Sequence, residues 1–257
     1  MQYRILKSFI TMKFLFFLTA ILFANGLVYG QQLQLHYDLR HTLNPVRNAK
    51  NFPTMYFEYF KTIDSGKTLV KPGNFLLKLQ ADLVGEQANI GKYYMQVSQE
   101  VRFWQPKLFI NLQYSGGLGI TTPRQYSYYI VNTYAIGLSY PFKIGDAYLS
   151  SVLNYKYVPY TRPSHDLLFT TYFYKGLLNY KAEIAGSFSC WTENKNHGDD
   201  PEINLKDKRF YFFFEPQFWY KVNGGLYIGT KLNAFYHVNT ADNIVEVYPT
   251  AAVKIKL

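Results

Sequence analysis

Five charged residues lie on one parity of three neighbouring segments of the chain, where their side chains can bind a polar solute or one another. They are Glu58, Lys78, Asp82, Glu100 and Arg102. Carboxylates accept hydrogen bonds from hydroxyl and amide groups, and Lys and Arg donate them, so such a set can hold a polar molecule. Charges enclosed by a low-dielectric wall also pair with one another. A structural network of ion pairs is therefore the alternative to solute contact for each of them.

The segments that carry these charges alternate between apolar and polar residues. In residues 75–83, one parity carries Lys78, Gln80 and Asp82, and the other is wholly apolar. Residues 93–103 repeat the pattern. A period of two indicates β-strands, because successive side chains of a strand point to opposite faces of the sheet. A soluble sandwich buries the apolar face, whereas a membrane barrel turns it to lipid and lines its lumen with the polar one. The alternation alone fits both.

The chain after residue 30 contains twelve alternating segments and no linker that would divide it, which predicts one domain over residues 31–257. Each segment is long enough to cross a thin bilayer as a tilted strand, which takes about 9–11 residues. The predicted strands are residues 31–40, 52–63, 75–83, 93–103, 107–116, 126–140, 147–157, 166–174, 177–191, 208–221, 225–238 and 244–257. Tight turns are expected at Gln105-Pro106, 141–146, Lys175-Gly176 and Asn223-Gly224.

The lengths of the links favour the membrane barrel. Links after even-numbered strands are short, and links after odd-numbered strands are longer, with 64–73 and 239–243 as exceptions. A barrel with both termini on one side of the membrane has short periplasmic turns and long external loops. The 25 Tyr and 21 Phe also suit a barrel, whose aromatic rings lie at both membrane–water boundaries. We therefore predict an all-β fold, a 12-stranded antiparallel transmembrane β-barrel of the outer membrane.

The lumen of this barrel receives the polar parity of every strand. It therefore contains the five charged residues and, on the wall opposite them, Lys181, Glu183, Arg209, Tyr211, Glu215, Gln217, Lys231, Asn233, Glu246 and Tyr248. A twelve-stranded barrel lies between small barrels filled by side chains and wide aqueous porins, so a narrow channel or a ligand-sized cavity is expected. Cys190, the single cysteine, falls on the lipid-facing parity and excludes an intramolecular disulfide.

The N-terminus has the pattern of a secretory signal. Arg4, Lys7 and Lys13 precede an apolar run at residues 14–24. That run is shorter than the roughly 20 residues of a transmembrane helix, so residues 1–30 are predicted to be a cleaved signal peptide. A retained anchor is the alternative. Export fits a location in the outer membrane of a Gram-negative cell.

The residues around the five charges resemble a known family. Thr54-Met55-Tyr56-Phe57-Glu58-Tyr59-Phe60, then Ala81-Asp82, then the run from Met95 to Arg102 are similar to the N-terminal part of Tsx-like nucleoside-specific channel-forming outer-membrane proteins. By that resemblance Glu58, Asp82, Glu100 and Arg102 are the matching positions, and passive uptake of nucleosides past stacking aromatic rings is implied. The chain departs from the class by ending in Lys256-Leu257, where such barrels end in an aromatic residue.

The expected function is a substrate-selective diffusion channel for nucleosides or similar small polar aromatic solutes, without cofactor, metal or nucleic acid, and as a single barrel. Outer-membrane lipid and lipopolysaccharide are expected partners, through Arg47, Lys50, Arg124, Arg162, Lys206 and Lys208. One alternative is a channel for other solutes, anions included. A second is a barrel enzyme acting on lipid or peptide, but the His-x-Ser element of such lipases is absent from all five histidine contexts, and no enzyme is predicted. Residues 192–207 are expected to form a solvated external loop.

Overall fold

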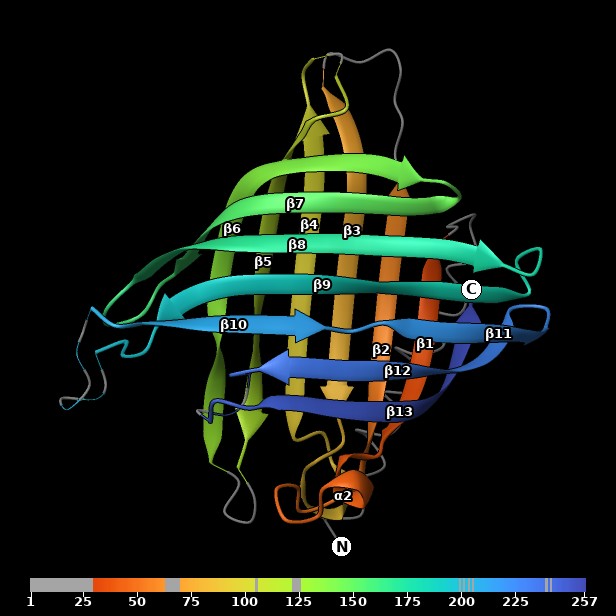
Figure 1. Cartoon of the computed structure of the whole chain (residues 1–257). Coiled ribbons are helices and arrows are strands. Elements are labelled where there is room, and N and C mark those ends of the chain that lie inside the picture. The colour runs from red at the N-terminus through yellow and green to blue at the C-terminus, as the bar shows by residue number, and fades with distance from the viewer. Residues whose placement is uncertain are drawn as a thin grey trace, which may run out of the picture.

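The computed structural model describes residues 30–62, 70–104, 106–121, 126–198, 200, 202, 204, 206–238, 240 and 242–257, and it is a closed antiparallel β-barrel (Figure 1). In Figure 1 the strands of the near wall cross those of the far wall at a steep angle, as tilted strands of a barrel do. The strands are β1 (Gln31–Asp38), β2 (Phe52–Thr62), β3 (Lys71–Asp82), β4 (Lys92–Arg102), β5 (Phe109–Ile120), β6 (Ser127–Ile144), β7 (Ala147–Val158), β8 (Ser164–Leu177), β9 (Ala182–Asn194), β10 (Lys208–Phe214), β11 (Gln217–Asn223), β12 (Leu226–Tyr236) and β13 (Val245–Lys256). Consecutive strands pair with each other, except that β10 and β11 both pair with β9 and with β12, and β1 pairs with β13 to close the barrel.

β10 and β11 are two parts of one strand, so the barrel has twelve strands, as predicted. Phe214 lies opposite Ala234 of β12, and Gln217 lies opposite Lys231, so the register is the same on both sides of the interruption. The register against β9 is likewise unchanged. Pro216 has no backbone N–H to donate, which removes one hydrogen bond and divides the strand.

The barrel is polar inside and apolar outside. On β1, Gln34, His36 and Asp38 are buried, whereas Leu35 and Tyr37 between them are about half exposed. The same alternation places large apolar side chains on the outer surface all around the wall, among them Leu112, Ile136, Leu138, Leu153, Leu167, Phe210, Phe218, Ile228, Val247 and Ile255. This is the reverse of a soluble protein, in which the enclosed face is apolar.

The two ends of the barrel differ. The end that carries helix α2 (Arg40–Leu43) and the 3-10 turn η1 (Glu86–Ala88) is called the α2 end, and its loops include 39–51 and 195–207. The opposite end, where β1 begins and β13 finishes, is called the terminal end, and its links include the short turns 145–146 and 224–225. Within the residues described, neither α2 nor η1 is a helix of the length and apolar character needed to cross a membrane.

Several predicted strand ends and turns are wrong. The turn predicted at Lys175-Gly176 lies at residues 178–181, so Lys181 belongs to a turn and is not on the lumen wall. β3 begins at Lys71, β5 extends to Ile120 and β6 extends to Ile144, because strand pairing continues past the expected boundaries. The segment between β4 and β5 is 103–108 and not a tight two-residue turn. Gln105, part of the 64–73 link, and the signal segment up to residue 29 lie outside the described residues.

The loops of the α2 end are held by their own contacts. Asn196, in the loop that was expected to be solvated, is 1% exposed and accepts a hydrogen bond from Gly198 N at 2.7 Å. Arg47 forms ion pairs with Asp242 and Glu246, and its hydrogen bond to Asp242 raises the pKa of its guanidinium. Of the other predicted lipopolysaccharide contacts, Lys50 donates to Gly85 O, Lys208 pairs with Asp166, and Arg124 lies outside the described residues.

Candidate solute pathway

A cavity of about 1610 Å³ occupies the lumen. Its lining runs from residues near the terminal end, such as Thr62 and Lys256, to residues near the α2 end, such as Asp38 and Lys156. All five charged residues singled out from the sequence line it: Glu58, Lys78, Asp82, Glu100 and Arg102. The strand alternation therefore places them on one enclosed surface.

Lys78 forms an ion pair, but its partner is not another of the five. Lys78 and Glu58 face each other in register on β3 and β2, yet the ammonium group reaches Glu215 across the lumen. Glu58 instead accepts a hydrogen bond from Gln32 Nε2 at 2.6 Å. Glu58 and Lys78 therefore do not pair with each other, although ion pairing among the five charges was the alternative to solute contact.

The other three are held by nearby polar groups. Asp82 accepts hydrogen bonds from Thr54 and Gln80 at 3.0 and 2.9 Å. Glu100 accepts one from the backbone N–H of Asn74 at 3.0 Å. Arg102 donates to Pro106 O at 3.1 Å, and its guanidinium lies over the ring of Phe109. These contacts orient the side chains.

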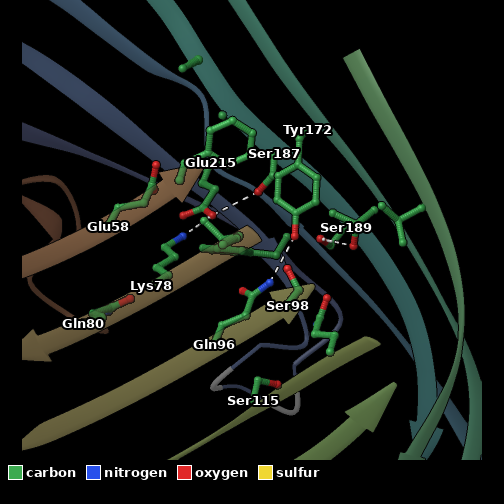
Figure 2. A pocket seen from close by; sticks show the side chains of 18 of the residues that line it. Glu58, Lys78, Gln80, Gln96, Ser98, Ser115, Tyr172, Ser187, Ser189 and Glu215 are labelled. Atoms are coloured by element: carbon green, nitrogen blue, oxygen red, sulfur yellow. Dashed lines mark hydrogen bonds and ion pairs between the residues drawn. The ribbon is translucent and has the colours of Figure 1, made fainter. Parts of the chain in front are cut away.

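The middle of the lumen contains a charged group that we call the central cluster, made of Lys78, Glu215 and Lys231. Lys78 Nζ lies 2.5 Å from Glu215 Oε1, and Lys231 Nζ forms an ion pair with Glu215 Oε2. Ser187 Oγ donates to Glu215 Oε1 at 3.0 Å. Figure 2 shows Lys78 and Ser187 converging on Glu215 from different strands. The cluster therefore links separate parts of the wall through the lumen.

The interruption between β10 and β11 positions Glu215. Its backbone N–H donates to Ser187 O at 2.9 Å, and the carbonyl of Pro216 accepts from Leu232 N at 2.9 Å. Gly186 of β9 lies against this junction, where a Cβ atom would come within 2.5 Å of Glu215 O and 2.9 Å of Pro216 Cα. Pro216 is tolerated in the wall because Gly186 leaves room for it.

Aromatic and hydroxyl groups surround the central cluster. Tyr56 OH accepts a hydrogen bond from Lys231 Nζ at 3.1 Å, and the same Nζ lies 4.3 Å from the Tyr56 ring centroid. Gln96 Nε2 donates to Tyr172 OH at 3.1 Å, and Figure 2 shows Ser98 and Ser189 beside this pair. The lining thus offers ring faces and hydrogen-bonding groups together.

Two buried residues near the cluster were not nominated from the sequence. His36 contacts Thr250 Oγ1 at 2.9 Å and Gln34 Oε1 at 2.8 Å, with its ring edge-on to Tyr56 and Trp219. Trp219 is fully buried and donates from Nε1 to Gln217 Oε1. Alternation on β1 and β11 assigns both side chains to the inside, but it does not show that the two strands bring them together.

Two further carboxylates in the lumen are each shared by two basic groups. Glu183 Oε2 lies 2.9 Å from Lys254 Nζ, and its Oε1 pairs with Lys256. Glu193 pairs with Lys156 and accepts from His197 Nε2 at 3.1 Å. Of the remaining residues predicted for this wall, Tyr211, Gln217 and Asn233 line the cavity. Among the described side chains, no group of three or more His, Cys, Asp or Glu is placed to hold a metal ion.

Comparison with known proteins gives one family match. A family model described as "Domain of unknown function (DUF5020)" matches residues 30–257, and no curated protein matches. Similar solved structures include a porin refined at 1.8 Å resolution (10% identity, 80% of this chain, 62% of that one), LpxR from Salmonella typhimurium (7%, 88% and 100%) and a bacterial polysaccharide outer membrane secretin (8%, 90% and 100%). The TM-score is 0.39 for each, and none of them assigns an activity to this chain.

Proposed function

Because this chain belongs to the DUF5020 family, whose description names no activity, we infer its function from its own lumen and surface. We propose that it is an outer-membrane channel through which small polar solutes diffuse, with nucleosides among them. The observation that carries this proposal is the cavity of about 1610 Å³, whose polar and aromatic lining reaches both ends of the barrel. A closed barrel with such a lumen gives a polar solute a route past lipid.

The outer surface supports a membrane location. On β6, Ile136 and Leu138 are about half exposed, and Tyr129 and Tyr140 are exposed to either side of them along the strand. An apolar band flanked by aromatic rings matches the hydrocarbon layer and its two interfaces. In water the same surface would be a large apolar patch of the kind that drives aggregation.

Nucleosides suit the lining in two ways. A planar base can stack on ring faces such as those of Tyr56 and Tyr172, and ribose hydroxyls can donate to carboxylates such as Glu58 and Asp82. The resemblance of residues 54–102 to Tsx-like channels points to the same solutes. Neutral solutes need no charged partner, so their binding should depend weakly on salt.

Adenosine or thymidine should block the current through this protein in a planar bilayer more strongly than ribose or glycine does. Glu58→Gln should weaken that block by roughly tenfold, because a hydrogen bond to a charged group is worth about 1.5 kcal/mol. Glu202→Gln, on an exposed loop residue, is the matched control and should leave the block unchanged. Equal block by nucleosides, sugars and amino acids would contradict the nucleoside assignment and leave an unselective pore.

The orientation of the barrel is tested by labelling single cysteines in a Cys190→Ser background. Lys206→Cys, on an exposed residue of the 195–207 loop, should react with a membrane-impermeant maleimide on whole cells. Asn223→Cys, exposed at the terminal end, should react only after the outer membrane is breached. Buried Asn196 is unsuitable for this purpose. Reaction at residue 223 in intact cells would invert the proposed orientation.

A further inference from the structure

Three lumen carboxylates, each shared by two bases, follow the length of β9. Glu183 is the second residue of this strand, Glu193 is the last but one, and Glu215 is hydrogen-bonded to Ser187 between them. At about 3.3 Å per residue, positions 183, 187 and 193 are separated by roughly 13 and 20 Å along the strand. The shared carboxylates thus occur near the terminal end, in the middle and near the α2 end of the lumen.

Two of these groups carry a net positive charge. Glu183 neutralises only one of Lys254 and Lys256, and Glu215 neutralises only one of Lys78 and Lys231. The third, Glu193, is balanced by Lys156 as long as His197 is neutral. The lumen is therefore positive from its middle to its terminal end.

The rest of the described lining strengthens this asymmetry. Charged residues that line the terminal half are Lys71, Arg102, Lys107, Lys143, Lys254 and Lys256 against Glu58, Glu100 and Glu183. Those that line the α2 half are Arg40, Lys92 and Lys156 against Asp38, Asp82 and Glu193. A lumen lined by an excess of one sign within low-dielectric walls concentrates ions of the opposite sign.

We propose that this lumen is selective for anions, and that the solutes it passes best are small organic anions carrying a phosphate or carboxylate. The inference rests on the proposed channel function and deepens it by naming the charge of the solute. A neutral nucleoside meets the hydrogen-bonding groups of the lining, whereas its monophosphate also meets the excess positive charge. The two features select for different parts of one molecule.

Sharing a carboxylate between two lysines suits passage better than bare lysines would. A pair of unshared lysines would hold an anion too firmly, whereas conduction needs sites that bind and release. Each ammonium group has three N–H donors. Lys78 and Lys254 each direct one donor to a carboxylate, which leaves capacity for a passing phosphate oxygen. Glu215 and Glu183 therefore position these lysines and limit their charge at the same time.

The test is the reversal potential of the intact protein in a planar bilayer under a potassium chloride gradient. Chloride should permeate better than potassium at about 0.1 M salt, and the preference should weaken towards 1 M as the Debye length falls from about 10 Å to about 3 Å. The double change Lys143→Gln and Lys256→Gln should lower the chloride-to-potassium permeability ratio severalfold, since both residues line the terminal half. Lys61→Gln is the matched control, because Lys61 is exposed at the same end but does not line the cavity. This change should leave the chloride-to-potassium permeability ratio unaltered.

Block by solute gives a second readout. Adenosine monophosphate should block the current more strongly than adenosine at low salt, and the difference should shrink at high salt. A conducting pore that prefers potassium, or that does not distinguish the two ions, overturns the anion proposal while the channel function stands. Absence of any conductance from correctly folded protein overturns the channel function itself.

Discussion

Replacing Glu215 by Gln should destabilise the barrel by about 3–5 kcal/mol, the usual cost of leaving a buried charge without its partner. Lys78 and Lys231 both pair with this carboxylate, and the side chain of Lys231 is 1% exposed. After the change, two ammonium groups face each other with only a neutral amide between them. Urea unfolding of the lipid-reconstituted protein, followed by Trp fluorescence, measures the loss because Trp219 is fully buried.

A second substitution separates charge repulsion from lost packing. Adding Lys231→Met to Glu215→Gln removes one of the two repelling charges, so the double variant should recover part of the lost stability. Glu202→Gln, on an exposed loop residue, controls for the loss of a carboxylate as such. If Glu215→Gln unfolds at the same urea concentration as the wild type, the central cluster does not contribute to stability.

Leu79→Arg should cost about 2–4 kcal/mol of stability, because it places a charge on the lipid-facing surface away from the strand ends. Leu79 lies on the outward parity of β3, opposite Phe57 and Met95. Gln80, its neighbour in the chain, lines the cavity and donates to Asp82 at 2.9 Å. Gln80→Arg should therefore be tolerated, because the new guanidinium can take over that contact. The two variants place the same side chain at neighbouring positions of β3, so comparing them tests which face of the strand points to lipid.

Refolding yield into lipid vesicles and urea midpoints of the two variants provide the measurement. A barrel whose lumen is polar predicts that only Leu79→Arg folds poorly. The reverse result would mean that the apolar parity is enclosed, and a soluble sandwich would then explain the alternation better.

Alternation predicted the wall of the barrel because it is a property of each strand by itself. Glu58, Lys78 and Glu100 all line the cavity, as the period of two requires. Turn positions were predicted less well. Gly176 looked like a hairpin glycine, yet it pairs with Glu183 inside the sheet. The actual turn uses positive φ angles of 52°, 55° and 63° at the consecutive non-glycine residues 178, 179 and 180, which few sequences signal.

The partners of the charged residues could not be predicted from the strands alone. Lys78 lies opposite Glu58 in register, so its neighbours in the sheet do not identify its actual partner. The pairing with Glu215 depends on the tilt of the strands and on the interruption at Pro216, which together decide what lies across the lumen. Lys78 and Glu215 are far apart in the chain, so no pattern of neighbouring residues predicts their contact.

The seam between β1 and β13 determines when this barrel can form. Leu257 N donates to Gln31 O, and Tyr37 lies opposite Ala251, so the closing hydrogen bonds join segments more distant in the chain than any other strand pair of the barrel. Such a contact is the slowest and entropically most costly to make. Before this contact forms, the edges of β1 and β13 carry backbone N–H and C=O groups to which lipid offers no hydrogen bond. Insertion into the membrane and closure of the barrel are therefore coupled. A chain truncated within β13 cannot close the barrel and is not stable in the bilayer.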